Sequence, residues 1–115
     1  MTEFVLDASA LVALIRKEIG WEEVEHCMPN SRMSAVNYSE TIYILRRRGM
    51  PLEAVRAALG PLIPSPAIFD GELAYVAAAM VESTRGQGIS FADCACLALA
   101  QFTGATAVTA ERRWC

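Results

Sequence analysis

The sequence predicts an α/β fold, a three-layer α/β/α sandwich around a central parallel sheet, formed by a single domain of residues 1–115. Short apolar runs typical of buried strands recur at residues 4–6, 33–36 and 105–109, and helical patterns separate them. Strands separated by helices pair in parallel through right-handed crossovers. With 54% hydrophobic residues, no repeat and no linker, the chain of 115 residues is expected to form one core.

Helices are expected at residues 10–16, 20–27, 37–49, 51–59, 71–84 and 91–103. Ser9, Asn37 and Ser90 are the expected N-caps, and Gly104 is the expected C-terminal signal of the last of these helices. A short edge strand is predicted at residues 62–64, where prolines exclude a central strand. A further helix is expected to begin after Ala110, and a further strand is expected beyond Cys115.

The net charge of −3 argues against a large electrostatic footprint for duplex nucleic acid, although it is compatible with a nuclease that binds metal through carboxylates. The apolar stretch at residues 4–15 is interrupted by Asp7 and is shorter than the ~20 residues of a membrane helix. Because no basic segment precedes it, no signal peptide is indicated, and a cytoplasmic location without membrane contact is expected.

The four cysteines are interpreted as free thiols. Cys94 and Cys96 lack the two-residue gap of a zinc or redox pair, and His26 is the only histidine. A zinc cage would therefore need cysteines from scattered parts of the fold.

Four acidic residues occupy equivalent positions, each just after a strand or in the first turn of a helix: Asp7, Glu40, Asp93 and Glu111. Ligands of open parallel sheets bind outside the carboxyl ends of the strands, so these side chains are expected to meet at one edge. Taken singly, Glu40, Asp93 and Glu111 also fit helix capping. Asp7, directly after an apolar strand, needs a partner to be stable there. Converging carboxylates repel one another unless a hard cation such as Mg²⁺ or Mn²⁺ lies between them.

The chain resembles a known family in four ordered segments. These are VLDASALVA at residues 5–13, SAVNYSE at 34–40, ISFADCACLALA at 89–100 and VTAERRW at 108–114. In order and spacing they resemble the signature segments of PIN-domain toxins of the VapC type, the toxin half of type II toxin–antitoxin systems.

The resemblance implies a Mg²⁺- or Mn²⁺-dependent endoribonuclease that hydrolyses RNA phosphodiester bonds and is neutralised by a cognate antitoxin. Asp7, Glu40 and Asp93 match the acidic positions of the family and would hold the metal or its waters, with Asp7 as the central ligand. Glu111 stands where the family usually has the aspartate of a Thr-x-Asp motif, and would complete the acidic ring. Family members also continue for one more strand.

Other residues have supporting roles in this interpretation. Ser9 and Thr109 would orient the carboxylates through hydrogen bonds or act as plain N-caps. Arg112 and Arg113 would contact phosphate. The arginines at 46–48 are expected to complement a helix dipole in solvent, with RNA contact as the alternative. Tyr43, Leu45 and the helix at 51–59 are expected to offer apolar surface for a homodimer or for an antitoxin helix.

Two other functions were considered. An aspartyl phosphotransferase of the haloacid dehalogenase type would need a second acidic residue where this chain has Ser9. The stronger alternative is a catalytically degenerate PIN domain, weakened by Glu111, that acts only as an antitoxin-binding or scaffolding module.

Overall fold

A computed structural model describes residues 2–110, and its centre is a three-stranded parallel sheet. The strands are β1 (Phe4–Leu6), β2 (Ser31–Arg32) and β3 (Thr106–Val108), in the order β2-β1-β3. Phe4 lies opposite Ser31 on one side and Thr106 on the other. The first and last predicted strands are confirmed, and the pairing is parallel as expected.

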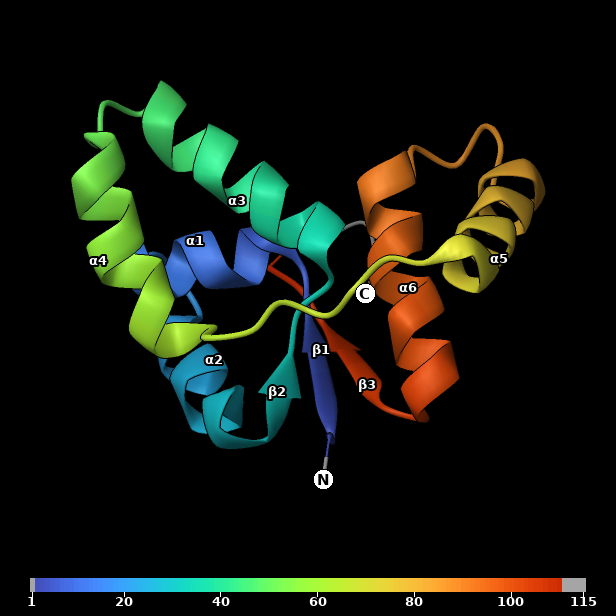
Figure 1. Ribbon diagram of the computed structural model, residues 1–115, viewed down its shortest axis with the longest axis horizontal. Coiled ribbons are helices and arrows are strands. Elements are labelled where there is room, and N and C mark those ends of the chain that lie inside the picture. The colour runs from blue at the N-terminus through green and yellow to red at the C-terminus, as the bar shows by residue number, and fades with distance from the viewer. Residues whose placement is uncertain (1, 111–115) are drawn as a thin grey trace.

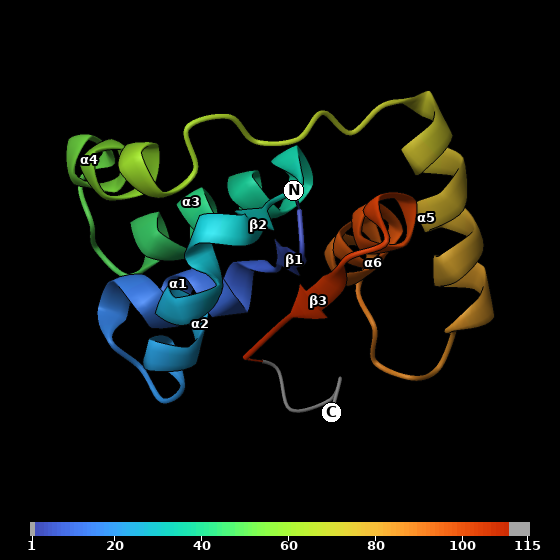
Figure 2. The ribbon, with the colours of Figure 1, turned by 90° about the horizontal axis from the view of Figure 1, so that it is seen from below.

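Helices cover both faces of this sheet, which confirms the three-layer α/β/α prediction (Figures 1 and 2). One side holds α1 (Ala8–Arg16), α2 (Trp21–Cys27), the short 3₁₀ segment η1 (Met28–Asn30), α3 (Ala35–Arg47) and α4 (Leu52–Leu62). The other side holds α5 (Gly71–Ser83) and α6 (Phe91–Thr103). Successive side chains of β1 point to opposite faces of the sheet, and each face has its own hydrophobic core. Leu6 packs into the core under α1–α4, and Val5 packs into the core under α5 and α6.

The second strand differs from the prediction. The strand predicted at residues 33–36 is wrong: β2 ends at Arg32, and Ser34 already caps α3 by accepting a hydrogen bond from the Val36 amide at 3.2 Å. The apolar run was misleading because Met33 is buried in the core without extending the strand. Asn37, the expected N-cap, therefore lies inside the first turn of α3.

The strand predicted at residues 62–64 is also wrong, because α4 continues through Pro61 to Leu62. Leu59 and Ile63 are both buried on the same face, four residues apart, and the Ile63 amide donates to the Leu59 carbonyl at 2.8 Å. Burial of this pair favours one more helical turn over a strand. The chain forms its parallel bridge later, between Ala67 and Ser34.

Helix boundaries otherwise follow the predicted signals, with one further exception. Ser90 caps α6, and Gly104 ends it in the left-handed conformation with φ 71°, both as predicted. The exception is Ser9, because α1 begins at Ala8 and its N-cap is Asp7. The helix expected after Ala110 lies outside the described residues.

The burial of individual side chains tests the apolar surface expected on α3 and α4, and the state of the cysteines tests the expected free thiols. Leu45 is fully buried rather than part of an apolar surface, as are Val55 and Leu59 of α4, whereas Tyr43 is 60% exposed. Cys27, Cys94 and Cys96 are free thiols, as predicted; Cys94 and Cys96 are buried, Cys27 is half-buried, and Cys115 lies outside the described residues. In the part of the chain that the structure describes, no helix is long and apolar enough to cross a membrane.

Candidate functional site

The candidate site begins at Asp7, which follows the carboxyl end of the central strand and is only 2% exposed. One carboxylate oxygen accepts hydrogen bonds from the Ala10 amide at 2.9 Å and the Ser9 hydroxyl at 2.8 Å. The other accepts from the Thr109 hydroxyl. Asp7 thus caps α1 and has its carboxylate orientation fixed from two directions.

Ser9 and Thr109 connect this carboxylate to the exit of β3. Their hydroxyl oxygens are 3.2 Å apart, and the Ser9 Oγ also accepts from the Ala110 amide at 2.9 Å. The Asp7 amide in turn donates to the Val108 carbonyl. The strand ends of β1 and β3 are therefore held together around Asp7. Of the two roles considered for Ser9, this network supports orientation of the carboxylate.

Burial raises the pKa of the Asp7 carboxyl above its usual value, and the negative charge of Asp93 acts in the same direction. The hydrogen bonds from Thr109, Ala10 and Ser9 oppose this shift because they stabilise the ionised form. Asp7 and Asp93, which are 86 positions apart in the sequence, therefore interact electrostatically.

Asp93 is the second buried carboxylate, with 8% of its surface exposed. It completes a capping box with Ser90: its carboxylate accepts from the Ser90 amide at 2.8 Å, and its own amide donates to the Ser90 Oγ at 3.1 Å. The capping role considered for Asp93 is therefore real. It also fixes the carboxylate at the start of α6, on the side of the sheet opposite α1.

Asn37 ties the helix that carries Glu40 to the helix that carries Asp93. Its side chain is fully buried, and its Nδ2 donates to the Ala92 carbonyl at 2.9 Å. The Asn37 Oδ1 is buried and accepts no hydrogen bond within residues 2–110. We did not predict this role, although the separation of Asn37 and Glu40 by three residues, which places both on one helix face, was a usable signal.

Glu40 lies half-buried one turn further along α3. The best indicator of its position is Cys96, a buried thiol of α6 whose pKa is raised first by burial and then by the charges of Asp7, Asp93 and Glu40. The charges of all three carboxylates reach this one thiol, which supports their placement near one another at the carboxyl end of the sheet. Among residues 2–110, no three His, Cys, Asp or Glu side chains form a group that could hold a metal ion by themselves.

The remaining predicted site residues, Glu111, Arg112 and Arg113, lie outside the described residues. The described part of the site offers carboxylate, hydroxyl and amide oxygens. Such donors suit hard cations such as Mg²⁺, Mn²⁺ and Ca²⁺ rather than soft ones. A cation held there could bind an anionic group of a substrate at the sheet edge.

The fold is a parallel α/β sandwich with an acidic site, formed by the buried Asp7 after β1 and the buried Asp93 in the first turn of α6. The family model described as PIN domain matches residues 4–115, and the chain belongs to that family. Two curated relatives, VapC ribonuclease Mb2780c from Mycobacterium bovis and Ribonuclease VapC42 from Mycobacterium tuberculosis, are each 35% identical over 112 residues. Each alignment covers 87% of this chain and 84% of the relative.

Solved structures agree on the fold. VapC20 from Mycobacterium tuberculosis, described as a sarcin-ricin loop cleaving toxin, superposes with a TM-score of 0.78 at 18% identity, covering 96% of this chain and 91% of that one. PAE2754 from Pyrobaculum aerophilum gives a TM-score of 0.64 at 22% identity, covering 97% of this chain and 83% of the other. Both likenesses extend over nearly the whole chain.

The raised pKa of Asp7 leads to a prediction about stability without metal. Because the folded pKa lies above the unfolded one, the unfolded chain loses this proton first, and the Asp7 contribution to stability falls as pH rises through the folded pKa. Asp7→Asn keeps an oxygen for the Ala10 amide and removes the charge. In chelator-treated buffer we expect this variant to melt above the wild type at neutral pH, and the advantage to disappear below the normal aspartate range.

The measurement is thermal unfolding by circular dichroism across pH. Asp70→Asn is the matched control, since Asp70 caps α5 through the Leu73 amide at 3.0 Å and takes no part in the hydrogen bonds described around Asp7. Asparagine caps as well as aspartate, so this control should show no such gain. A neutral-pH melting temperature of Asp7→Asn below that of the wild type would contradict the prediction.

Proposed function

We propose that the protein is a Mg²⁺- or Mn²⁺-dependent endoribonuclease toxin that hydrolyses RNA phosphodiester bonds and is neutralised by a cognate antitoxin. The observation that supports this best is the buried Asp7 carboxylate, oriented by two hydroxyls and an amide, with a pKa that the charge of Asp93 also raises. The curated relatives are named ribonucleases, which supports RNA as the substrate.

The donor set is compatible with the proposed metal. Asp7 and Asp93 would hold the ion directly, and Glu40 would hold it through water. Mg²⁺ commonly uses one or two carboxylates and keeps several waters, so three direct protein ligands are not required. The buried Asn37 Oδ1, which accepts no hydrogen bond from any residue that the structure describes, is a further acceptor for such a water beside the start of α6. When bound, the ion would make a water more acidic and neutralise charge on the phosphate.

The chain's own residues would set the geometry of the reaction. The hydrogen bonds to Asp7 favour its ionised form and partly offset the effect of burial on its pKa, and its position does not depend on a flexible loop because it caps α1. Asp93 is fixed by its capping box, and Glu40, the more exposed of the three, would face the substrate side. Glu111 would complete the acidic ring, and Arg112 and Arg113 would contact the phosphate.

Cleavage of RNA by protein purified free of antitoxin is the direct test. With Mg²⁺ or Mn²⁺ the wild type should cut a labelled single-stranded RNA, and Asp7→Asn should lower the rate by roughly a hundredfold or more while remaining folded. Asp70→Asn, the same chemical change at the α5 cap, should cut at the wild-type rate.

Two outcomes would count against the proposal. Equal cleavage by wild type and Asp7→Asn would indicate a contaminating nuclease and refute the assignment of the site. Absence of any cleavage by folded wild type with either metal would favour the degenerate binding module instead.

The hydroxyl network supports a positioning role for Thr109. Thr109→Val keeps the side-chain shape but removes the hydrogen bond to Asp7, so kcat should fall roughly ten- to a hundredfold with little change in KM. Thr109→Ser retains the hydroxyl and should restore most of the rate. Loss of activity in both variants would contradict a positioning role for Thr109. The same would follow if Thr109→Val and Thr109→Ser lost Mn²⁺ binding and folding stability to an equal extent.

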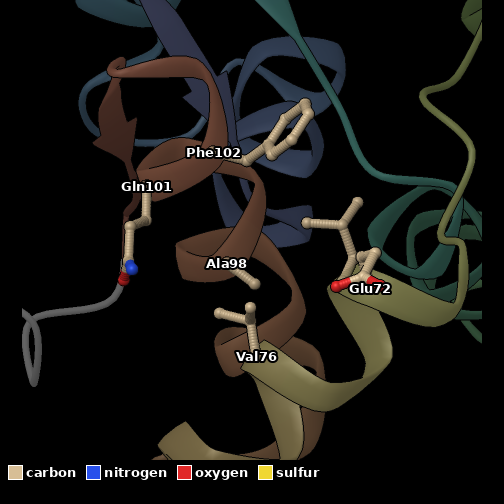
Figure 3. A pocket seen from close by; sticks show the side chains of 6 residues that line it. Glu72, Val76, Ala98, Gln101 and Phe102 are labelled. Atoms are coloured by element: carbon tan, nitrogen blue, oxygen red, sulfur yellow. The ribbon is translucent and has the colours of Figure 1, made fainter.

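We also propose protein partners, a cognate antitoxin and a second copy of the chain, with the cytoplasm as the place of action. A groove of about 250 Å³ lies between α5 and α6, where Figure 3 shows Val76 and Ala98 facing each other. Phe102 beside it and Tyr75 are 76% and 81% exposed. These apolar side chains suit a protein partner better than they suit water.

Light scattering after size exclusion tests the homodimer. We expect a mass twice that of the chain, and a shift toward monomer for Phe102→Glu if the groove between α5 and α6 is the interface. Gln101→Glu adds the same charge at the neighbouring lining position and distinguishes loss of apolar contact from repulsion. A strict monomer at high concentration would contradict the dimer.

A further inference from the structure

A second groove begins beside the carboxylates and runs between α1 and α3, which lie side by side in Figures 1 and 2. Its volume is about 240 Å³, and it is lined by Ser9, Val12, Glu18, Ile44, Arg48 and Ala110. Ser9 binds Asp7 at one end of this α1–α3 groove, and Glu18 and Arg48 form an ion pair at the other. Ser9, which donates a hydrogen bond to Asp7, therefore places one end of the groove next to the candidate active site.

The length of the α1–α3 groove suits a strand of RNA. Ser9 lies in the first turn of α1 and Glu18 just past its end, so the groove follows the nine-residue helix for about 13 Å at ~1.5 Å per residue. A stacked strand carries a phosphate roughly every 3.4 Å, so this distance spans a few nucleotides beyond the scissile bond. Val12 and Ile44 provide an apolar floor between the two polar ends.

The far end of the groove has an excess of positive charge. The Arg48 Nη1 lies 2.7 Å from the Glu18 Oε2, and the Arg16 Nε lies 3.9 Å from the same oxygen. Two guanidinium groups thus share one carboxylate. The Arg48 and Glu18 side chains are each 43% exposed, and exposed pairs of this kind contribute little to stability. A phosphate could therefore replace Glu18 at small cost and receive two hydrogen bonds from Arg48.

We propose that this groove binds the RNA strand next to the scissile phosphate, with Arg48 contacting a neighbouring phosphate and Glu18 occupying its place in the free protein. The inference rests on the proposed ribonuclease function and adds to it a substrate-binding residue and an internal competitor. Of the arginines at 46–48, for which RNA contact is the alternative role, only Arg48 lines this groove. Its neighbour Arg47 instead donates to the Tyr43 hydroxyl at 3.0 Å, outside the groove.

Opposite effects of two substitutions test this inference. In the Asp7→Asn background with Mg²⁺ present, binding of a short mixed-sequence single-stranded RNA is measured by fluorescence anisotropy at several salt concentrations. Arg48→Gln should raise Kd roughly three- to tenfold and reduce the slope of log K against log salt by about 0.7, the value for one lost single-strand phosphate contact. Glu18→Gln should lower Kd roughly two- to fivefold.

The two variants lose the same ion pair, so a purely structural role would change their melting temperatures alike and leave RNA binding unaffected. Arg47→Gln is the matched control, since it removes one charge from the same end of α3 and should leave Kd within about twofold, given screening over ~8 Å at physiological salt. In otherwise wild-type protein, Arg48→Gln should raise KM more than it lowers kcat.

The result that overturns the proposal is a Kd of Arg48→Gln equal to that of Arg47→Gln, or a Glu18→Gln variant that binds RNA more weakly. Either result, with cleavage by the wild type intact, would exclude the groove from RNA binding and leave the ribonuclease function standing. If the wild type neither cuts nor binds RNA, the proposed function fails first and this inference fails with it.

Discussion

Burial of the Asp7 carboxylate at the end of the central strand is the constraint on which the rest of the structure depends. A charged group in a core costs several kcal/mol unless it is well bonded. Here a helix amide and two hydroxyls from different parts of the chain offset part of that cost. The same bonds start α1 and hold the ends of β1 and β3 together. The hydrogen bonds that form the start of α1 therefore also fix the position of the Asp7 carboxylate.

Helices on opposite faces of the sheet contribute to one site because each begins at the same sheet edge. Asp7 starts α1 on one side and Ser90 with Asp93 starts α6 on the other, while α3 enters beside β2. The parallel order of the strands favours this arrangement, since each connection leaves from the carboxyl end of one strand and must return the chain to the opposite end before the next strand begins. Acidic side chains in first turns therefore converge even when they are far apart in sequence.

Much of this could be predicted from the sequence where local signals and burial agree. The three-layer fold, α6 with its Ser90 cap and the positions of Asp7 and Asp93 follow from strong patterns. The errors occur where burial overrides local preference. Met33 is an apolar core residue beyond the strand, and Leu59 with Ile63 extends α4 through Pro61. The Asn37 contact with Ala92 and the Glu18–Arg48 pair depend on helix packing, for which no local pattern exists.

The hydrogen bond from the Asn37 side-chain amide to the Ala92 carbonyl limits where sequences of this fold can diverge. It fixes α3 against α6 near their first turns, at the sheet edge, while their far ends lead into turns and loops that contact solvent. Insertions and substitutions in those distant connections can change partner or substrate preference without altering the spacing of the carboxylates. A lineage can therefore diversify at the periphery while its reactive centre stays geometrically constant.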